Sequence, residues 1–229
     1  MSKTVTGIIL AAGSGSRMKL GITKQKIIFG EETVLRRSAR IFNECPDIDS
    51  IVIVARADEI GFATEQTRDL SKVRAIVAGG ASRAESAKCG FVAAGDTGYV
   101  AIHDAARCFV TAEMISKVIA DAKKYGAATA SSVVTDTVKS VDGMGRVTAT
   151  VDRNTLRSIQ TPQVFISELY GKALTSVSLP NASITDDNSL LERIGVFSYC
   201  TDTGKNNIKI TTKEDLILAN AFLNGEYDG

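Results

Sequence analysis

TGIILAAGSGSRM occupies residues 6–18 and decides the fold of this chain. An apolar, strand-like run over residues 7–10 leads into a loop of Ala, Gly and Ser, and the cations Arg17 and Lys24 follow. Small residues let the main chain come close to a ligand, so a loop of this kind can wrap its N–H groups around phosphates. We therefore expect a nucleotide-binding site where the first strand ends.

Outward from this stretch, short apolar runs alternate with segments of helical periodicity, which predicts a mostly parallel, twisted sheet flanked by helices. The expected strands are 7–10, 50–55, 73–78, 99–103 and 127–134, and the expected helices are 33–43, 58–70, 83–94 and 112–125. The chain shows no repeat, linker or low-complexity tract. We therefore expect one α/β domain over residues 1–229.

The pattern changes after residue 134. Residues 137–141 and 146–151, joined by a turn at 142–145, predict a polar hairpin, and we take residues 136–155 as an arm. Such a hairpin is either a contact to a second subunit or an ordinary surface feature. Beyond it we expect a helix after Ser167, a helix from Thr185 with Asp186 and Asp187 in its first turn, strands at 196–199 and 208–210, and a helix from Thr212.

Composition excludes several classes of protein. The 229 residues carry a net charge of +1 and no Trp, which argues against nucleic acid as a partner. His103 is the single histidine, and no two of the four cysteines have CxxC spacing, so neither a structural zinc site nor a disulfide framework is expected. No run approaches the roughly 18 apolar residues of a membrane span, and the N-terminus does not resemble a signal peptide. We expect a cytoplasmic protein with no membrane contact.

Two common nucleotide motifs fail on residue identity. A dinucleotide fingerprint requires Gly where Met18 stands, and a Walker A loop requires Gly-Lys-Ser/Thr, which is absent. A Gly-rich turn with nearby cations can also be purely structural. The loop alone therefore does not identify the site.

HDAAR at residues 103–107 ends an expected strand, where ligands of open α/β sheets bind. Asp104 suits Mg²⁺, which prefers carboxylate and phosphate oxygens, and Arg107 suits an anion. The alternative is a structural pair between Asp104 and Arg107. His103 is interpreted as a packing or hydrogen-bonding residue rather than a catalyst.

Two further segments are informative only in combination. GGASRAES at residues 79–86 places a glycine turn before a helix, where N–H groups favour an anion or a nucleobase carbonyl, although Ser82 can equally be just an N-cap. Lys209 lies in NIKIT at residues 207–211, and a lone lysine in a strand usually faces solvent.

Seven segments occur in order from residue 7 to about residue 222: LAAGSGSRM with KQ, GGASRAES, HDAAR, TDTVK, VDRNTLRSIQTPQVF, ITDDNSLLE and NIKITTKEDL. Together they resemble the 2-C-methyl-D-erythritol 4-phosphate cytidylyltransferase family of isoprenoid precursor synthesis. The resemblance implies a Rossmann-like nucleotidyltransferase fold with a β-arm that makes a homodimer. It also implies transfer of CMP from CTP to a small polyol phosphate, with release of pyrophosphate and a requirement for Mg²⁺ or another divalent cation.

The resemblance assigns roles to individual residues. Arg17 and Lys24 match residues that stabilise the transition state, and Arg153 and Lys209 join them as catalytic candidates. Asp104 matches the metal ligand. Positions that hold the nucleotide are Leu10, Ala11, Ala12, Gly13, Gly15, Gly80, Ser86, Asp104 and Ala105. Acceptor-binding positions are Arg107, Thr185 and Lys209, together with Thr137 and Arg153 from the neighbouring subunit. The alternative for Arg153 is a surface pair with Asp152.

The chain departs from the family pattern in three places. Thr23 stands where Pro is common before Lys-Gln, which is expected to loosen the loop that carries Lys24, because Pro pre-sets the backbone. Cys108 replaces the usual Pro after HDAAR and is either reactive or buried and inert. Lys205-Asn206 stands where some relatives carry an acidic residue, so no second metal carboxylate is named.

Two other functions remain open at this point. The sister enzymes that transfer CMP to ribitol 5-phosphate share the reaction, but Ala106, Lys139 and residues 153–160 look more like the isoprenoid branch. A CTP-binding sensor without turnover is the alternative from another class. The retained cations argue against it, because a sensor does not need transition-state stabilisation.

Overall fold

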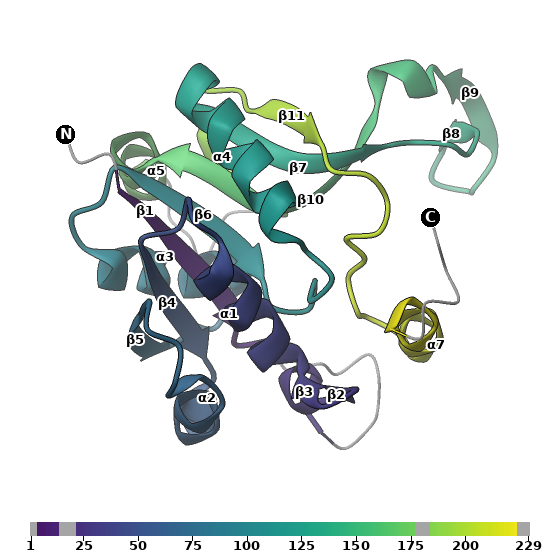
Figure 1. The fold of residues 1–229 in the computed structure, drawn as a ribbon. Helices are drawn as coiled ribbons and strands as arrows, with labels where there is room; N and C mark the ends of the chain where they lie inside the picture. The colour runs from purple at the N-terminus through teal and green to yellow at the C-terminus, as the bar shows by residue number, and fades with distance from the viewer. Residues whose placement is uncertain (1–3, 14–21, 177–183, 224–229) are drawn as a thin grey trace.

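The computed structural model describes residues 4–13, 22–176 and 184–223. Its centre is a seven-stranded sheet of order β11-β7-β10-β6-β1-β4-β5 (Figure 1). Strand β10 runs antiparallel to β6 and β7, and the other neighbours pair in parallel. The strands are β1 (Val5–Ala11), β4 (Ser50–Ala55), β5 (Val73–Ala78), β6 (Tyr99–Asp104), β7 (Ala127–Val133), β10 (Arg157–Ile166) and β11 (Tyr199–Asp202). The predicted mostly parallel α/β fold is confirmed.

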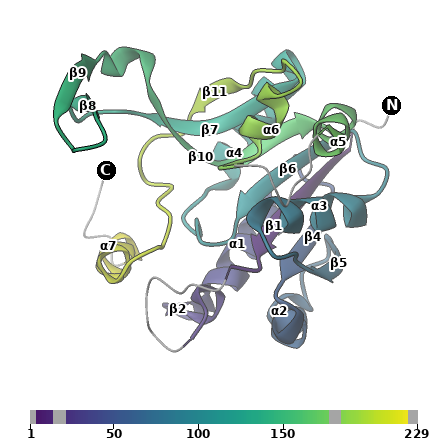
Figure 2. The same cartoon turned by 180° about the vertical axis from the view of Figure 1, so that it is seen from behind.

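Helices cover both faces of the sheet. One face packs α1 (Val34–Glu44), α2 (Ile60–Thr67) and α4 (Ala112–Tyr125) over a continuous apolar core (Figure 1). The other face carries α3 (Arg83–Ala94), α5 (Ser167–Thr175) and α6 (Asn188–Glu192) over a second core (Figure 2). Strand β1 is buried along its whole length between these layers, which explains its nearly continuous apolar sequence.

Helix α3 lies very close to β1. A Cβ atom on Gly90 would lie 2.4 Å from Cγ2 of Ile8, so only glycine permits this approach. The close contact fixes the N-terminus of α3 beside the end of β1, where the Gly-rich loop begins.

A third, smaller core joins segments that are far apart in sequence. It contains Ile27, Phe29, Cys108, Ile210 and Ala219. These residues come from the segment around η2 (Lys24–Lys26), β2 (Ile28–Phe29) and β3 (Glu32–Thr33), from the loop after β6, and from the approach to α7 (Lys213–Leu223). This core brings Lys24 and Lys209 to the end of β6.

The predicted hairpin is present. Strands β8 (Val138–Val141) and β9 (Val147–Val151) pair only with each other within the described residues and project beyond the main sheet (Figure 1). They lie inside the range 136–155 expected for the arm, and η4 (Arg153–Thr155) follows β9.

Strand β10 was not predicted. Pro162 lies within it and argues against a central strand, because proline has no N–H to donate. The structure accommodates this proline with a shift of register between Ile159 and Gln163 in the pairing with β7. The irregularity turns Gln160 and Thr161 toward the site described below.

Other predicted elements were partly wrong. The helix expected from Thr185 begins at Asn188, so Asp186 and Asp187 precede it, because their carboxylates bind other groups. The strand expected at 196–199 is β11, shifted to Tyr199–Asp202. Residues 208–210 form no strand; in this segment the Lys209 side chain donates to Asp104, and the N–H of Ile210 donates to the carbonyl of Ala106. The helix expected over 58–70 is divided into η3 (Ala57–Glu59) and α2. Across the described ranges, no helix combines the length and the apolar character needed to span a bilayer.

Candidate active site

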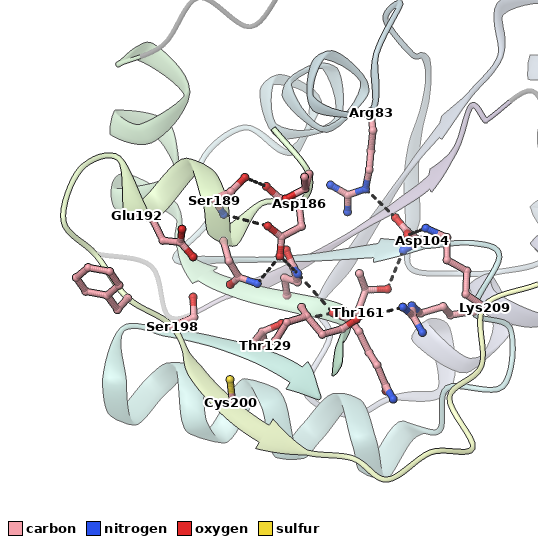
Figure 3. Close-up of a pocket in the computed structure, with 17 residues that line it drawn as sticks. Arg83, Asp104, Thr129, Thr161, Asp186, Ser189, Glu192, Ser198, Cys200 and Lys209 are labelled. Atoms are coloured by element: carbon pink, nitrogen blue, oxygen red, sulfur yellow. Dashed lines mark hydrogen bonds and ion pairs between the residues drawn. The ribbon is translucent and has the colours of Figure 1, made fainter. Parts of the chain in front are cut away.

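Two cavities open at the carboxyl ends of β1 and β6 and share one wall of three charged residues: Arg83, Asp104 and Lys209. We call the first the loop-side cavity; its volume is about 420 Å³. We call the second the β10-side cavity; its volume is about 520 Å³ (Figure 3). Ligands of open α/β sheets bind at the carboxyl ends of parallel strands, and the site predicted from the sequence lies at this end of the sheet.

The floor of the loop-side cavity comes from the end of β1 and from η2. The ammonium group of Lys24, a residue only 8% exposed, donates to the carbonyl of Ile210 at 3.0 Å. Next to it, Gln25 Nε2 donates to the carbonyl of Gly13 at 3.4 Å. These contacts tie η2 to both the Gly-rich loop and the segment before α7.

The opposite side of this cavity is the glycine turn before α3. A Cβ atom on Gly79 would lie 2.6 Å from Cβ of Ala12 and 2.7 Å from Oγ of Ser86, so the turn closes only with glycine there. Ser82 caps α3: its hydroxyl accepts from the N–H of Glu85 at 3.1 Å, and the Glu85 carboxylate accepts from the N–H of Ser82 at 2.9 Å. Ser82 is therefore the N-cap that the sequence allowed.

Asp104 is the centre of the shared wall (Figure 3). Arg83 Nε donates to Asp104 Oδ1 at 3.0 Å, and Lys209 Nζ donates to Asp104 Oδ2 at 2.5 Å. Burial raises the pKa of this carboxyl group, but the charges of Arg83 and Lys209 outweigh burial and hold its pKa well below the usual range. Asp104 is therefore ionised at neutral pH. A lone lysine in a strand usually faces solvent, but Lys209 forms an ion pair with Asp104.

Arg83 also donates to a second carboxylate, that of Asp187. Its Nη1 donates to Asp187 Oδ2 at 2.7 Å, and the buried Tyr170 hydroxyl donates to Asp187 Oδ1 at 2.7 Å. Burial disfavours the charged guanidinium, but Asp187 and Asp104 outweigh this and raise the pKa of Arg83. Arg83 therefore stays charged between the two cavities.

Arg107 presents a different kind of cation to the β10-side cavity. Its Nη1 donates to the carbonyl of Asn207 at 2.8 Å and its Nη2 to the carbonyl of Ile159 at 3.4 Å, while its buried Nε has no partner. Within the described residues no carboxylate forms an ion pair with it, so the pair with Asp104 considered from the sequence is absent. Burial lowers the pKa of Arg107. A half-buried guanidinium that forms no ion pair with a carboxylate favours an anionic ligand.

The predicted site residues outside the arm fall into four groups. The first lines the loop-side cavity: Leu10, Ala12, Gly13, Lys24, Gly80, Ser86, Asp104 and Lys209. Arg107 and Thr185 line the β10-side cavity. Ala11 and Ala105 are buried in the core instead, and Ala106 lines the loop-side cavity beside Ala105. Gly15 and Arg17 lie outside the described residues.

Thr137 and Arg153 lie on the arm and line neither cavity of their own chain. Arg153 Nη1 donates to the carbonyl of Thr135, and Asp152 accepts from the N–H of Asn154. The surface pair between Arg153 and Asp152 is therefore not formed, and both Thr137 and Arg153 are exposed.

The three departures have local explanations. Thr23 has φ −74°, an angle that proline also adopts, and its hydroxyl donates to Glu59 at 2.6 Å, so the expected loosening is not seen. Cys108 is fully buried, and burial raises the pKa of its thiol to about 12, which favours the inert alternative. Lys205 donates to the hydroxyl of Thr135 at 2.9 Å.

Sequence analysis missed the residues that support Arg83. Arg83 itself was quoted within GGASRAES without a role, and Tyr170 and Gln163 were not singled out. Gln163 Oε1 accepts from the N–H of Asp187 at 2.9 Å and so helps to fix that buried carboxylate. The adjacent carboxylates Asp186 and Asp187 were the available signal, but they were interpreted as the first turn of a helix.

Asp104 is the residue predicted from the sequence to hold a metal ion. Within the described residues no group of three or more His, Cys, Asp or Glu side chains could hold an ion, and Asp104 is the only carboxylate among the described residues that line the loop-side cavity. A single carboxylate suits a Mg²⁺ ion that takes its other ligands from substrate phosphates and water. The residues present fit an ion that arrives with a nucleotide.

Comparison with known proteins identifies the family. A sequence profile described as 2-C-methyl-D-erythritol 4-phosphate cytidylyltransferase matches residues 5–225. The chain belongs to this family. The cytidylyltransferase of that name from Clostridium tetani is 40% identical over 218 residues, which cover 94% of this chain and 89% of the relative. The one from Geobacter metallireducens is 39% identical over 229 residues, covering 96% and 97%.

Solved structures of the same family share the fold. The 4-diphosphocytidyl-2C-methyl-D-erythritol synthase from Anaerococcus prevotii superposes with a TM-score of 0.86 at 30% identity, covering 97% of this chain and 96% of that one. The cytidylyltransferase from Thermus thermophilus gives a TM-score of 0.78 at 26% identity, covering 98% and 100%. The family resemblance inferred from the seven ordered segments is confirmed.

Proposed function

We propose that this member of the cytidylyltransferase family transfers CMP from CTP to 2-C-methyl-D-erythritol 4-phosphate and releases pyrophosphate. The observation that carries the proposal is the pair of cavities with a shared wall of Arg83, Asp104 and Lys209. A transferase of this kind must hold two phosphorylated substrates with their reacting atoms side by side. We assign CTP to the loop-side cavity and the acceptor to the β10-side cavity.

The chemistry that such a site must perform is a displacement at phosphorus. A phosphate oxygen of the acceptor forms a bond to the α-phosphorus of CTP, and the bond from that phosphorus to the bridging oxygen of the β-phosphate breaks. Pyrophosphate leaves with the electron pair. The nucleophile is already an anion, so no covalent enzyme intermediate is needed. Catalysis then consists of positioning and charge stabilisation.

The cations of the site suit these tasks. Lys24 borders the loop-side cavity and Lys209 borders both cavities, so we propose that they stabilise charge on the triphosphate. Arg107 has a half-buried guanidinium that forms no ion pair with a carboxylate of the described residues, which supports a role in binding the acceptor. We keep Arg17 as a further catalytic candidate on the strength of the family match.

We propose that Asp104 holds Mg²⁺ together with phosphate oxygens of CTP. When bound, the ion would neutralise phosphate charge. Both carboxylate oxygens of Asp104 now accept from cations, so Arg83 and Lys209 keep this group ionised and oriented at the boundary of the two cavities.

We also propose that the chain forms one nucleotidyltransferase domain and that two copies associate as a homodimer through the arm. Support comes from three large apolar side chains on the hairpin: Val141, Met144 and Val147 are 58%, 74% and 63% exposed. A two-stranded hairpin is marginal alone, and exposed apolar side chains on it favour a partner surface. Thr137 and Arg153 at its base would then reach the acceptor of the neighbouring subunit. A cytoplasmic location stays a proposal, supported by four free cysteines.

The experiment that tests the reaction is a pyrophosphate-release assay with CTP and Mg²⁺. It offers 2-C-methyl-D-erythritol 4-phosphate and ribitol 5-phosphate separately. Release with the first acceptor alone supports the proposal, and release with ribitol 5-phosphate alone assigns the chain to the sister reaction. CTP binding without release with either acceptor supports the sensor.

A matched pair of variants tests the role of η2. Lys24→Ala removes the buried ammonium beside the loop-side cavity, whereas Lys26→Ala removes a lysine that does not line this cavity and pairs with Glu59 at 3.1 Å. We expect turnover to fall by roughly a hundredfold or more in Lys24→Ala and to change little in Lys26→Ala. Equal effects of the two substitutions would contradict the assignment of Lys24.

A further inference from the structure

A closed ring of hydrogen bonds lies beside Asp104 and joins Thr161, His103, Arg107 and Asn207. Thr161 Oγ1 lies 3.1 Å from His103 Nδ1, and His103 Nε2 lies 3.3 Å from the carbonyl oxygen of Arg107. Arg107 Nη1 donates to the carbonyl of Asn207, and Asn207 Nδ2 donates back to the carbonyl of Thr161, each at 2.8 Å. Asp104 joins the ring because its N–H donates to Thr161 Oγ1 at 3.1 Å (Figure 3).

The direction of each bond around the histidine follows from chemistry. A carbonyl oxygen only accepts, so His103 Nε2 must carry the proton that binds Arg107. Thr161 Oγ1 accepts from the Asp104 N–H and has one proton of its own, which it donates to an unprotonated Nδ1. The sequence of donors is therefore Asp104 N–H, Thr161 O–H and His103 Nε2–H, ending at the Arg107 carbonyl.

We infer that His103 is a positioning residue that, as the neutral Nε2–H tautomer, joins the backbone of Asp104 to that of Arg107 through the Thr161 hydroxyl. Asp104 lies in the shared wall, and Arg107 lines the β10-side cavity. The ring thus sets the spacing between the carboxylate at the boundary and the guanidinium proposed to bind the acceptor. This inference rests on the proposed function for its effect on catalysis but not for the hydrogen bonds themselves.

Burial supports the neutral state. His103 is fully buried and its ring centroid lies 5.0 Å from that of Phe42, so a charge on the ring would lose its solvation. Asn207 is also fully buried, and Thr161 is only 5% exposed. A buried polar ring of this kind has few alternative arrangements, so loss of one member leaves partners unpaired.

The direct test is the tautomer of His103 in the ¹⁵N-labelled wild-type protein. The chain has a single histidine, so the couplings between its ring protons and ring nitrogens need no assignment. We expect a protonated Nε2 and an unprotonated Nδ1. A protonated Nδ1 would overturn the inference. This measurement needs no substrate, so it stays informative even if the protein transfers no CMP.

Two substitutions at Thr161 test the effect on the site. Thr161→Val keeps the shape but removes the hydroxyl, whereas Thr161→Ser keeps the hydroxyl. We expect Thr161→Val to lower kcat/KM for the acceptor by roughly tenfold to a hundredfold, while KM for CTP changes by less than about threefold. Thr161→Ser should restore most of the loss. If Thr161→Val matches Thr161→Ser in kcat/KM for the acceptor, the positioning role is wrong.

The control is Thr67→Val. Thr67 is 2% exposed, and its hydroxyl donates to the carbonyl of Ala63 within α2, away from both cavities. The same chemical change should leave both substrate constants unaltered there. An equal loss in Thr67→Val would show that the effect at Thr161 comes from general destabilisation and would overturn the inference.

Discussion

Asp187 is a buried carboxylate whose charge the structure needs for stability. Its side chain is 1% exposed and accepts from Arg83 and from Tyr170. Asp187→Asn keeps the shape but leaves a single oxygen for two donors, so either Arg83 or Tyr170 must face an amide N–H. We therefore expect this substitution to destabilise the fold strongly.

The magnitude follows from the surroundings. Removing one partner of a fully buried ion pair costs about 3–5 kcal/mol. Arg83 is 28% exposed and keeps its contact with Asp104, so its remaining charge is partly compensated. We expect the free energy of unfolding to fall by about 2–3 kcal/mol. For a chain of this size that corresponds to a decrease in Tm of roughly 4–12 °C.

Urea and thermal unfolding followed by circular dichroism measure this change. Two further variants are measured for comparison. Tyr170→Phe removes one donor to Asp187 and should cost about 1–3 kcal/mol. Glu168→Gln breaks an exposed pair with Lys172 on α5 and should cost about 0.5 kcal/mol or less. If Asp187→Asn destabilised the protein no more than Glu168→Gln, the argument about the buried pair would be refuted.

Further predictions concern the wall and the buried titratable groups. Lys209→Met should lower kcat/KM for pyrophosphate release by about tenfold or more, because Asp104 loses a cation, whereas Lys213→Met on exposed α7 should not. Iodoacetamide should modify the exposed Cys200 long before the buried Cys108, as peptide mapping can check. The His103 ring should stay neutral in NMR titrations to about pH 5, because burial lowers its pKa to about 4. In the unfolded chain the pKa of a histidine is about 6.5, so the contribution of neutral His103 to the free energy of unfolding is fully present above about pH 6.5. About 3 kcal/mol of this free energy is lost as the pH falls toward about 4. Unfolding experiments at several pH values measure this loss.

The sequence predicted those parts of the fold that depend on local pattern. Strand β1 and helices α3 and α4 were predicted from apolar patterns, and Ser82 was recognised as a possible N-cap of α3. Strand β10 could not be found in this way, because Pro162 interrupts the pattern and only the pairing with β6 and β7 makes the segment a strand. Its burial is a consequence of the completed sheet.

The candidate site shows the same division. Lys24 and Asp104 could be proposed from the sequence because each follows an expected strand in a short motif, and the family match then gives each a role. Arg83, Tyr170 and Asp187 were not proposed, because their connection spans 104 residues between Arg83 and Asp187 and exists only when α3, α5 and the segment before α6 are packed together. A charge pair of that separation leaves no periodic trace in one sequence.

The most direct test of the two-cavity account follows the α-phosphorus of CTP. The wild-type enzyme is incubated with Mg²⁺, 2-C-methyl-D-erythritol 4-phosphate and CTP labelled at that phosphorus. The products are then separated and identified by mass spectrometry. The account predicts that the label appears in a cytidine diphosphate ester of the acceptor, with an equal amount of pyrophosphate. Label recovered as free CMP beside an unmodified acceptor would contradict it, because the two cavities would then not bring the substrates together.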